Sequence, residues 1–229
     1  LREWVSNRYQ SKGVKVDPEE VLVTNGSQQG LDLVGKIFLN QEDPVLVERP
    51  TYLFVLQSFG LYEPIFHSLP LGQEGVDVLD LQEALNRFRP KLFYAVPNFQ
   101  NPTGTSYSLE CRKEVARVLK GSDTVLVEDD PYGEIRFLGE DHPPVKAFLG
   151  ESLILGSFSK VVSPGIRLGW VTAPSEVMDK LVTAKQASDL HTSLLSQMII
   201  HCYLSDYDVE AHLKRIRSMY KRKRDLMVS

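Results

Sequence analysis

Short, largely apolar runs alternate along this chain with longer segments in which apolar residues recur at helical spacing. The apolar runs are three to five residues long and occupy 21–24, 45–47, 65–69, 92–96, 124–127, 153–155 and 168–171. Such runs are typical of strands buried on both faces, as in the parallel sheets of α/β proteins. We therefore predict a mostly parallel, seven-stranded sheet.

Amphipathic segments fill the intervals between these runs. We expect helices at 27–39, 51–59, 78–87, 109–119, 175–188 and from 193 to the end of the chain. The first dozen residues are expected to form the end of a helix, with Leu1, Trp4 and Val5 on one face. Strands separated by helices in this way indicate an α/β fold in which helices flank the sheet.

The length and composition of the chain fit a globular protein. Of its 229 residues, 42% are hydrophobic and 24% are charged, which excludes a disordered or fibrous chain. No apolar run approaches the roughly 18 residues of a membrane span. The opening Leu-Arg-Glu-Trp lacks both regions of a secretory signal and an initiator Met, so we expect a fragment whose start lies upstream.

Charge is distributed unevenly along the chain. Residues 214–224 carry seven cations and no acid, and without them the net charge of −4 would be −11. A basic run can bind nucleic acid, but Ile216, Met219 and Tyr220 at helical spacing favour a solvated helix face, so no nucleic-acid partner is predicted. The two cysteines, Cys111 and Cys202, lack the spacing of a zinc site. They are too few to cross-link a domain of this size, so we expect the reducing environment of the cytoplasm.

Unusual polar residues follow several of the predicted strands, at the sheet edge where open α/β sheets bind ligands. Asn25-Gly26-Ser27-Gln28 leads from the first strand into a helix whose free N–H groups favour an anion, with Ser27 and Gln28 as further donors. Ser27 could instead be a simple N-cap. The two-proline turn 97–104 would fix the amide of Asn101, or it could be an ordinary Asn-Pro turn.

Two later turns carry ionisable groups. Glu128, Asp129 and Asp130 end a buried strand, which is costly unless they bind a cation or cap the next helix. The five histidines are scattered, and no metal site is predicted. Lys160, in Gly-Ser-Phe-Ser-Lys, becomes a carbonyl nucleophile if it is buried or flanked by a cation, and Arg167 is a strong phosphate ligand. An anion cradle, a fixed amide, a carboxylate and an amine together meet the demands of pyridoxal 5′-phosphate (PLP).

Four motifs resemble those of the class I/II aminotransferases of PLP fold type I. They are Asn-Gly-Ser-Gln-Gln-Gly, Pro-Asn-Phe-Gln-Asn-Pro-Thr-Gly, Glu-Asp-Asp-Pro-Tyr-Gly and Gly-Ser-Phe-Ser-Lys with Pro-Gly-Ile-Arg-Leu-Gly-Trp. The resemblance is strongest to the 2-aminoadipate, kynurenine and aromatic aminotransferase branch. It implies a PLP-binding large domain at 13–205, preceded at 1–12 by the end of an N-terminal or interdomain helix. Residues 206–229 would begin the helix that leads to a C-terminal small domain outside this chain.

The resemblance also implies roles for individual residues. Lys160 would form the Schiff base with PLP and move the substrate proton, and Asp129 would pair with the ring nitrogen. Asp130 is the rival on sequence alone, but the family's Asp-x-x-Tyr spacing selects Asp129. Tyr52 would stack on the ring. The remaining contacts would be Asn101 and Tyr132 to the ring hydroxyl, and Ser27, Gln28, Ser157, Ser159 and Arg167 to the phosphate.

The function implied is that of a PLP-dependent aminotransferase. Such an enzyme moves the amino group of an L-amino acid to a 2-oxo acid by a ping-pong mechanism through pyridoxamine phosphate, as a cytoplasmic homodimer. Two alternatives share the same motifs: a fold type I C–S β-lyase, and the PLP-binding effector domain of a MocR-type transcriptional regulator. The arginine that binds the substrate carboxylate in this family would lie beyond the end of this chain.

Overall fold

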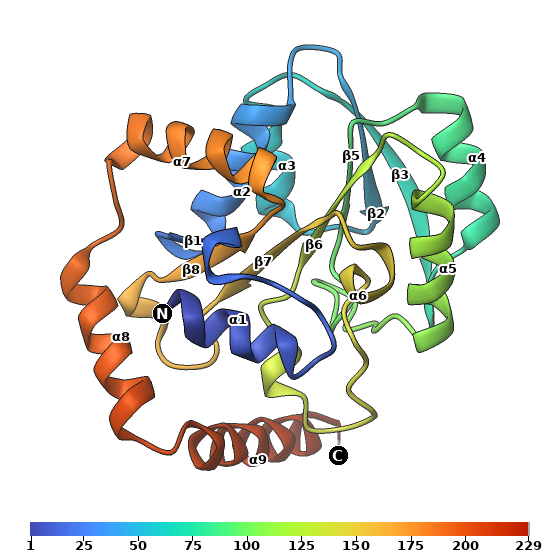
Figure 1. Cartoon of the computed structure of the whole chain (residues 1–229). Coiled ribbons are helices and arrows are strands. Elements are labelled where there is room, and N and C mark those ends of the chain that lie inside the picture. Colours follow the sequence, from blue (N-terminus) through green and yellow to red (C-terminus); the bar gives the residue numbers. More distant parts are fainter. Residues whose placement is uncertain (229) are drawn as a thin grey trace.

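The computed structural model describes residues 1–228 as one sheet between two layers of helices (Figure 1). In this part of the chain, eight strands form the sheet in the order β1-β8-β7-β6-β5-β2-β3-β4. Their bounds are Val21–Thr24 (β1), Pro44–Arg49 (β2), Ile65–Gly72 (β3), Gly75–Val76 (β4), Leu92–Ala95 (β5), Val125–Asp129 (β6), Leu153–Ser157 (β7) and Gly169–Thr172 (β8). The seven predicted strands are all present, and the two-residue β4 is an addition at the edge.

The centre of the sheet is parallel. Strands β3, β2, β5, β6 and β7 pair in parallel, whereas β8 lies antiparallel between β7 and β1, and β4 is antiparallel to β3. Parallel neighbours need a crossover connection, and the helices supply it. The carboxyl ends of β5, β6 and β7 therefore meet at the same edge of the sheet, with the turns that follow them side by side.

The helices agree with the predicted segments except for the short α6, which was not predicted, and near the carboxyl end of the chain. Their bounds are Arg2–Gln10 (α1), Gly26–Phe38 (α2), Leu53–Gly60 (α3), Val78–Phe88 (α4), Leu109–Leu119 (α5), Lys146–Leu149 (α6), Ser175–Asp189 (α7), Leu194–Asp206 (α8) and Val209–Val228 (α9). The single helix expected from residue 193 is wrong: it is divided into α8 and α9. Tyr207 is extended, and the Asp208 carboxylate accepts the Ala211 N–H at 2.9 Å, which starts a new helix.

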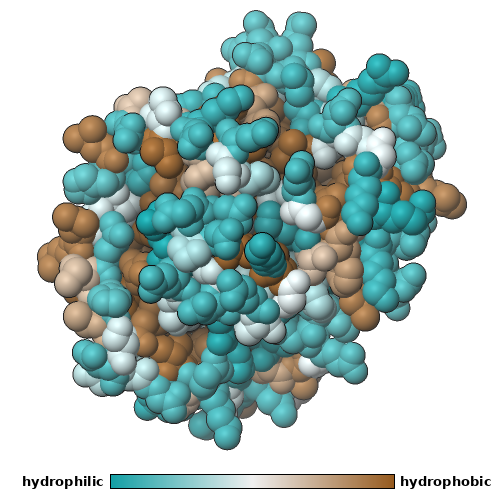
Figure 2. All heavy atoms as spheres, in the orientation of Figure 1, coloured by the Kyte–Doolittle hydropathy of each residue, from teal (hydrophilic) through white to brown (hydrophobic). Residues whose placement is uncertain are grey.

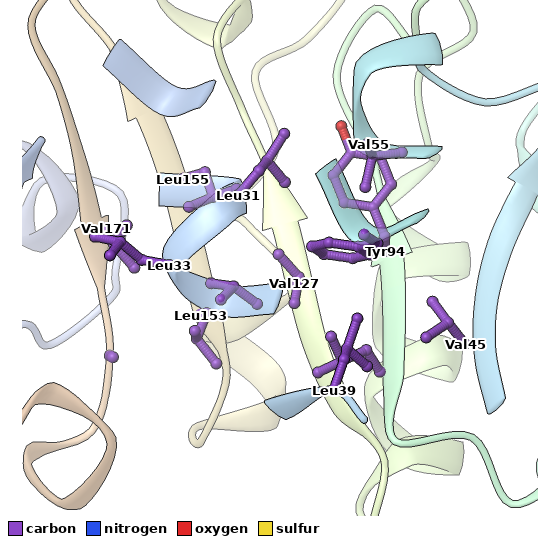
Figure 3. Close-up of a cluster of buried hydrophobic side chains, with 14 of the residues drawn as sticks. Leu31, Leu33, Leu39, Val45, Val55, Tyr94, Val127, Leu153, Leu155 and Val171 are labelled. Atoms are coloured by element: carbon purple, nitrogen blue, oxygen red, sulfur yellow. The ribbon is translucent and has the colours of Figure 1, made fainter. Parts of the chain in front are cut away.

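Successive residues of each central strand enter different cores because side chains alternate across a sheet. One face packs against α2, α3 and α7, and Figure 3 shows Leu31 and Leu33 of α2 among Val127, Leu155 and Val171 of the sheet. The other face packs against α4 and α5, and farther along against α1. Fully burying one such side chain contributes about 1.5–3 kcal/mol, so both helical layers are firmly held.

The last two helices are the most exposed part of the structure. Hydrophobic spheres gather over α8 in Figure 2, where Leu194, Leu195, Met198 and Ile199 are exposed. The seven cations lie on α9, whose buried anchor is Leu213, whereas Met219 is exposed. No helix in residues 1–228 is both long and apolar enough to cross a membrane.

Candidate functional site

A cavity of about 450 Å³ opens at the carboxyl edge of the sheet, between the ends of the central strands and the start of α2. It is lined by all ten residues predicted from the sequence: Ser27, Gln28, Tyr52, Asn101, Asp129, Tyr132, Ser157, Ser159, Lys160 and Arg167. Phe54, Tyr94, Val96, Pro131 and Pro164 complete the lining. Residues up to 140 positions apart in the sequence are thus brought to one place.

One end of the cavity is built to attract an anion. Helix α2 begins at Gly26, whose φ is +74°, and a Cβ there would come within 2.6 Å of the Arg167 guanidinium. Glycine therefore lets the guanidinium lie against the amino end of the helix, where free N–H groups and the helix dipole already favour negative charge. Gly169 has a similar role, because a Cβ there would lie 2.6 Å from the Ser27 nitrogen.

Ser27, Gln28 and Ser157, all expected to contact the phosphate, lie at this end of the cavity and differ in the hydrogen bonds they make. Ser27 lies inside the first turn, and the N-cap of α2 is Asn25, which makes no side-chain cap bond. The side chain of Gln28 was expected to donate to the ligand, but the structure shows it bonded elsewhere. Its amide nitrogen donates to Ser58 Oγ at 2.6 Å and to the Phe54 carbonyl at 3.4 Å, which leaves only its backbone N–H for a ligand. Ser157 Oγ accepts the Ser159 N–H at 3.1 Å and so orders the turn before Lys160.

Asp129 supplies a buried carboxylate to the cavity. It ends β6, is 3% exposed, and accepts a hydrogen bond from the Tyr94 hydroxyl to Oδ2 at 2.7 Å. Its other oxygen, Oδ1, is buried without a hydrogen-bond partner among the described residues. Burial, with smaller contributions from the charges of Asp130 and Glu48, raises the pKa of Asp129 to about 7, although the bond from Tyr94 lowers it. A bare buried acceptor of this kind is costly, and a cationic N–H donor would stabilise it.

The three successive carboxylates point to different surroundings. Glu128 is fully buried and accepts the Val145 and Lys146 N–H groups at 3.1 and 3.2 Å. Asp130 accepts from the Asn98 amide at 3.0 Å and the Gly133 N–H at 2.9 Å, and it does not line the cavity. Glu128 and Asp130 are therefore occupied by structural hydrogen bonds, which leaves only Asp129 of the three in the cavity. No cluster of metal-ligating side chains occurs within residues 1–228.

Lys160 lies at the mouth of the cavity. Its side chain is exposed, and its Nζ is 6.0 Å from the centroid of the Tyr132 ring. In the described part of the chain it takes part in no hydrogen bond or ion pair, so the amine is free to move. Of the two conditions named from the sequence, burial is not met, whereas Arg167, the neighbouring cation, lines the same cavity.

Asn101 and Tyr132 form a pair at the cavity wall. The Asn101 amide nitrogen donates to the Tyr132 hydroxyl at 3.4 Å, and the peptide bond that follows Asn101 is cis. Burial, together with the negative charge of Asp129, raises the pKa of Tyr132, and the bond from Asn101 lowers it. Tyr52 is partly buried, and burial first and Asp129 second raise the pKa of its hydroxyl.

Sequence reasoning missed the groups that support the cavity. Tyr94 was assigned to the apolar interior of a strand, and its hydroxyl was the available signal. A second group holds the amino end of α2: Asp189 accepts from Lys185 at 2.8 Å, from Asn25 at 2.6 Å and from Gln29 at 2.7 Å. Burial alone would raise the pKa of Asp189, but these hydrogen bonds lower it.

Comparison with protein-family models matches residues 1–229 to the family described as aminotransferase class I and II. The chain is 41% identical over 235 residues to aromatic-amino-acid aminotransferase 1 of Thermococcus litoralis, across 100% of the chain and 56% of that protein. It is 45% identical over 221 residues to the 2-aminoadipate transaminase of Thermus thermophilus, across 94% of the chain and 55% of that protein. The solved structure of a kynurenine aminotransferase from Pyrococcus horikoshii matches with a TM-score of 0.91 and 39% identity, over 100% of this chain and 57% of that one.

Similarity also extends to transcriptional regulators. The chain is 35% identical over 230 residues to YisV, an uncharacterized HTH-type transcriptional regulator of Bacillus subtilis, across 100% of the chain and 48% of that protein. In all of these alignments the chain spans about half the length of its relative.

Proposed function

Because this chain belongs to the class I and II aminotransferases, we propose that it is the cofactor-binding part of a PLP-dependent aminotransferase. The whole protein would transfer the amino group of an L-amino acid to a 2-oxo acid. The observation that carries the proposal is the bare oxygen of Asp129, buried in the same cavity that Lys160 and Arg167 line. A carboxylate with one unpaired oxygen, an amine and a cation beside a helix amino end are a set of groups suited to one ligand class.

The donor set fits PLP group by group. Arg167, the amino end of α2 and the hydroxyls of Ser157 and Ser159 would hold the phosphate. Asp129 would face the ring nitrogen, and Asn101 with Tyr132 would hold the ring hydroxyl. Tyr52 would cover one ring face, and Lys160 is the amine for the aldehyde. When bound, PLP supplies an electron sink that stabilises negative charge on the α-carbon of an amino acid.

The residues of this chain would hold and move protons around that sink. An ionised Asp129, oriented by Tyr94, keeps a proton on a facing ring nitrogen because the ion pair favours the charged form of both groups. The Nζ of Lys160, which has no hydrogen-bond or ion-pair partner in the described residues, would accept a proton from the α-carbon and return it. The side chains of Asn101 and Tyr132, which are bonded to each other, would hold the ring hydroxyl and so limit how far the ring can turn.

Domain boundaries, assembly and location are part of the same proposal. Residues 13–205 would form the PLP-binding large domain, and α9 would lead toward a small domain. Leu194, Leu195, Met198 and Ile199 leave an exposed apolar surface on α8, which supports a homodimer. Cys111 and Cys202 are both free thiols, which suits the cytoplasm.

A second candidate is the PLP-binding effector domain of a transcriptional regulator. The 35% identity to YisV over the whole of this chain favours it. The enzyme remains the better-supported proposal because the aminotransferase relatives are 41% and 45% identical.

A visible absorption spectrum of the full-length protein with PLP separates the two candidates. For an aminotransferase, a mixture of amino acids should discharge the long-wavelength band of the bound cofactor, and a 2-oxo acid should restore it. A Lys160→Ala variant is the matched control, since it should show neither change. A band that no amino acid discharges would contradict the enzyme and favour the effector domain.

A further inference from the structure

A second buried carboxylate lies close to the cavity without lining it. Glu48, near the end of β2, is 1% exposed. Its Oε1 accepts the Val96 N–H at 3.2 Å and the Tyr107 hydroxyl at 2.6 Å, and its Oε2 accepts the Gln100 amide nitrogen at 3.1 Å. Burial raises the pKa of Glu48 to about 7, despite these three donors. A group this costly to bury usually has a specific role.

Gln100 extends the contact of Glu48 to two loops. Its amide nitrogen also donates to the Pro50 carbonyl at 2.7 Å, and its amide oxygen accepts from the N–H and hydroxyl of Thr103 at 3.0 and 2.8 Å. Its backbone N–H bonds the Thr105 carbonyl, and its own carbonyl accepts from Gly104. Every polar group of the Gln100 amide is therefore committed, which fixes the side chain in one orientation.

The two loops carry residues that line the cavity. Pro50 lies two residues before Tyr52, in the connection from β2 to α3, and Gln100 immediately precedes Asn101, in the turn after β5. Strands β2 and β5 are parallel neighbours, so both loops leave the sheet at the same edge. In the described structure, the Gln100 amide is the hydrogen-bonded bridge between the Glu48 carboxylate, the Pro50 backbone and the Thr103 turn.

We propose that Glu48 is a positioning residue, which acts through Gln100 to hold Tyr52 and Asn101 in register across the cavity. The inference rests on the proposed function, because it is there that Tyr52 and Asn101 are assigned to the cofactor. Both oxygens of Glu48 are needed, because Oε1 receives the Val96 N–H and the Tyr107 hydroxyl while Oε2 receives the Gln100 N–H. An amide at position 48 has one acceptor oxygen, and with that oxygen toward the Val96 N–H and the Tyr107 hydroxyl its NH₂ group faces the NH₂ group of Gln100. The bridge then breaks, or the Gln100 amide turns away from Pro50 and Thr103.

Glu48→Gln is the sharpest perturbation, because it keeps the shape of the side chain and removes one acceptor. Tyr107→Phe is the matched control: the same carboxylate loses a hydrogen bond, of 2.6 Å, but the bridge to the loops stays intact. Wild type and both variants are compared in the full-length protein at pH 8.5, which lies above the pKa of about 7 of Glu48 in the wild-type chain. If Glu48→Gln does not fold, Gln100→Met, which keeps side-chain length and removes both polar ends, takes its place.

The first readout is amide hydrogen exchange of the PLP-free protein in peptides that cover residues 49–54 and 98–105. Glu48→Gln should speed exchange about tenfold in both peptides, as expected for loss of a hydrogen bond to a charged group, whereas Tyr107→Phe should leave them within about twofold of wild type. Unchanged exchange, or an equal rise in both variants, would overturn the positioning role.

The second readout is PLP affinity by absorbance titration, with the visible circular dichroism of the bound cofactor. Glu48→Gln should weaken PLP binding about tenfold and alter the dichroism, and Tyr107→Phe should do neither. Wild-type affinity in Glu48→Gln would overturn the inference. A wild-type protein that binds no PLP would overturn the proposed function instead, and the exchange comparison would then decide the role of Glu48 by itself.

Discussion

Arg167 is the residue whose removal tests the anion end of the cavity most simply. Its guanidinium lies against Gly26 at the start of α2 and has a carbonyl contact to Pro164 at 3.5 Å. Among the described residues that line the cavity, the cationic side chains are Lys160 and Arg167. Arg167→Ala therefore leaves Lys160 as the one remaining cation of this lining. The affinity of the full-length protein for PLP should therefore fall.

The size of the fall follows from the exposure of the side chain. A hydrogen bond to a charged group contributes about 1.5–3 kcal/mol. Arg167 is exposed in this structure, and solvent screening places it near the lower bound, about 1.5 kcal/mol or roughly tenfold in Kd. Arg167→Lys should lose part of that, about threefold, because an ammonium keeps the charge without the planar fork of donors.

The assay is a PLP titration followed by absorbance, with inorganic phosphate as a competitor. The competitor should lose affinity in the same proportion, since it shares only the phosphate contacts. Arg222→Ala is the control, because Arg222 is an exposed cation on α9 outside the cavity. If Arg167→Ala binds PLP and phosphate as tightly as Arg222→Ala does, the assignment of this end of the cavity to a phosphate is refuted.

Three further predictions concern the buried carboxyl groups. Asp129→Asn should reduce turnover about 100-fold while PLP stays bound, and Asp130→Asn should reduce it only mildly. Steady-state kinetics measure both variants, and a larger loss of turnover in Asp130→Asn would show that the wrong carboxylate was assigned. Tyr94→Phe should destabilise the PLP-free protein by about 1–2 kcal/mol in urea unfolding at pH 8.5, and by less at pH 5.5, because the hydrogen-bonded carboxylate of Asp129 is ionised only above its pKa of about 7. A loss of the same size at both pH values would show that this carboxylate does not titrate as expected. Burial raises the pKa of Glu48, Glu128 and Asp129 to about 7 in each case, so the folded state retains protons that the unfolded chain releases near pH 4–5. Their contribution to stability is therefore complete below pH 4 and is lost as the pH rises toward 7, and unfolding of the PLP-free protein at pH 5 and pH 8 should show this decline, whereas a rise would contradict it.

The strands were predictable because a strand buried on both faces has a continuous apolar run, whereas a helix has apolar residues at intervals of three or four. The two-residue β4 carries no such pattern, since Gly75 and Val76 pair with β3 only through a local turn. The break between α8 and α9 was missed because apolar spacing continues across it. Asp208 was the available signal, as an acidic residue three positions before Ala211, whose N–H it accepts.

The cavity residues were predictable because they follow strand ends, where a parallel sheet gathers its loops. Their supports were not, because those depend on contacts between distant segments. The Gln28 amide is occupied by Ser58, and the Asp129 carboxylate is oriented by Tyr94, a residue that the strand pattern assigns to the core. Likewise, Glu48 directly follows a predicted strand, and the sequence gives no sign that its carboxylate reaches the loop of Gln100.

The most direct test of the account is to locate the lysine that bonds to PLP. The full-length protein is loaded with PLP, reduced with borohydride, digested, and analysed by mass spectrometry for the modified peptide. One dominant adduct is expected on Lys160, and it should be lost in Lys160→Ala. An adduct that forms specifically on another lysine, or no adduct in the wild-type protein, would contradict the assignment of this cavity.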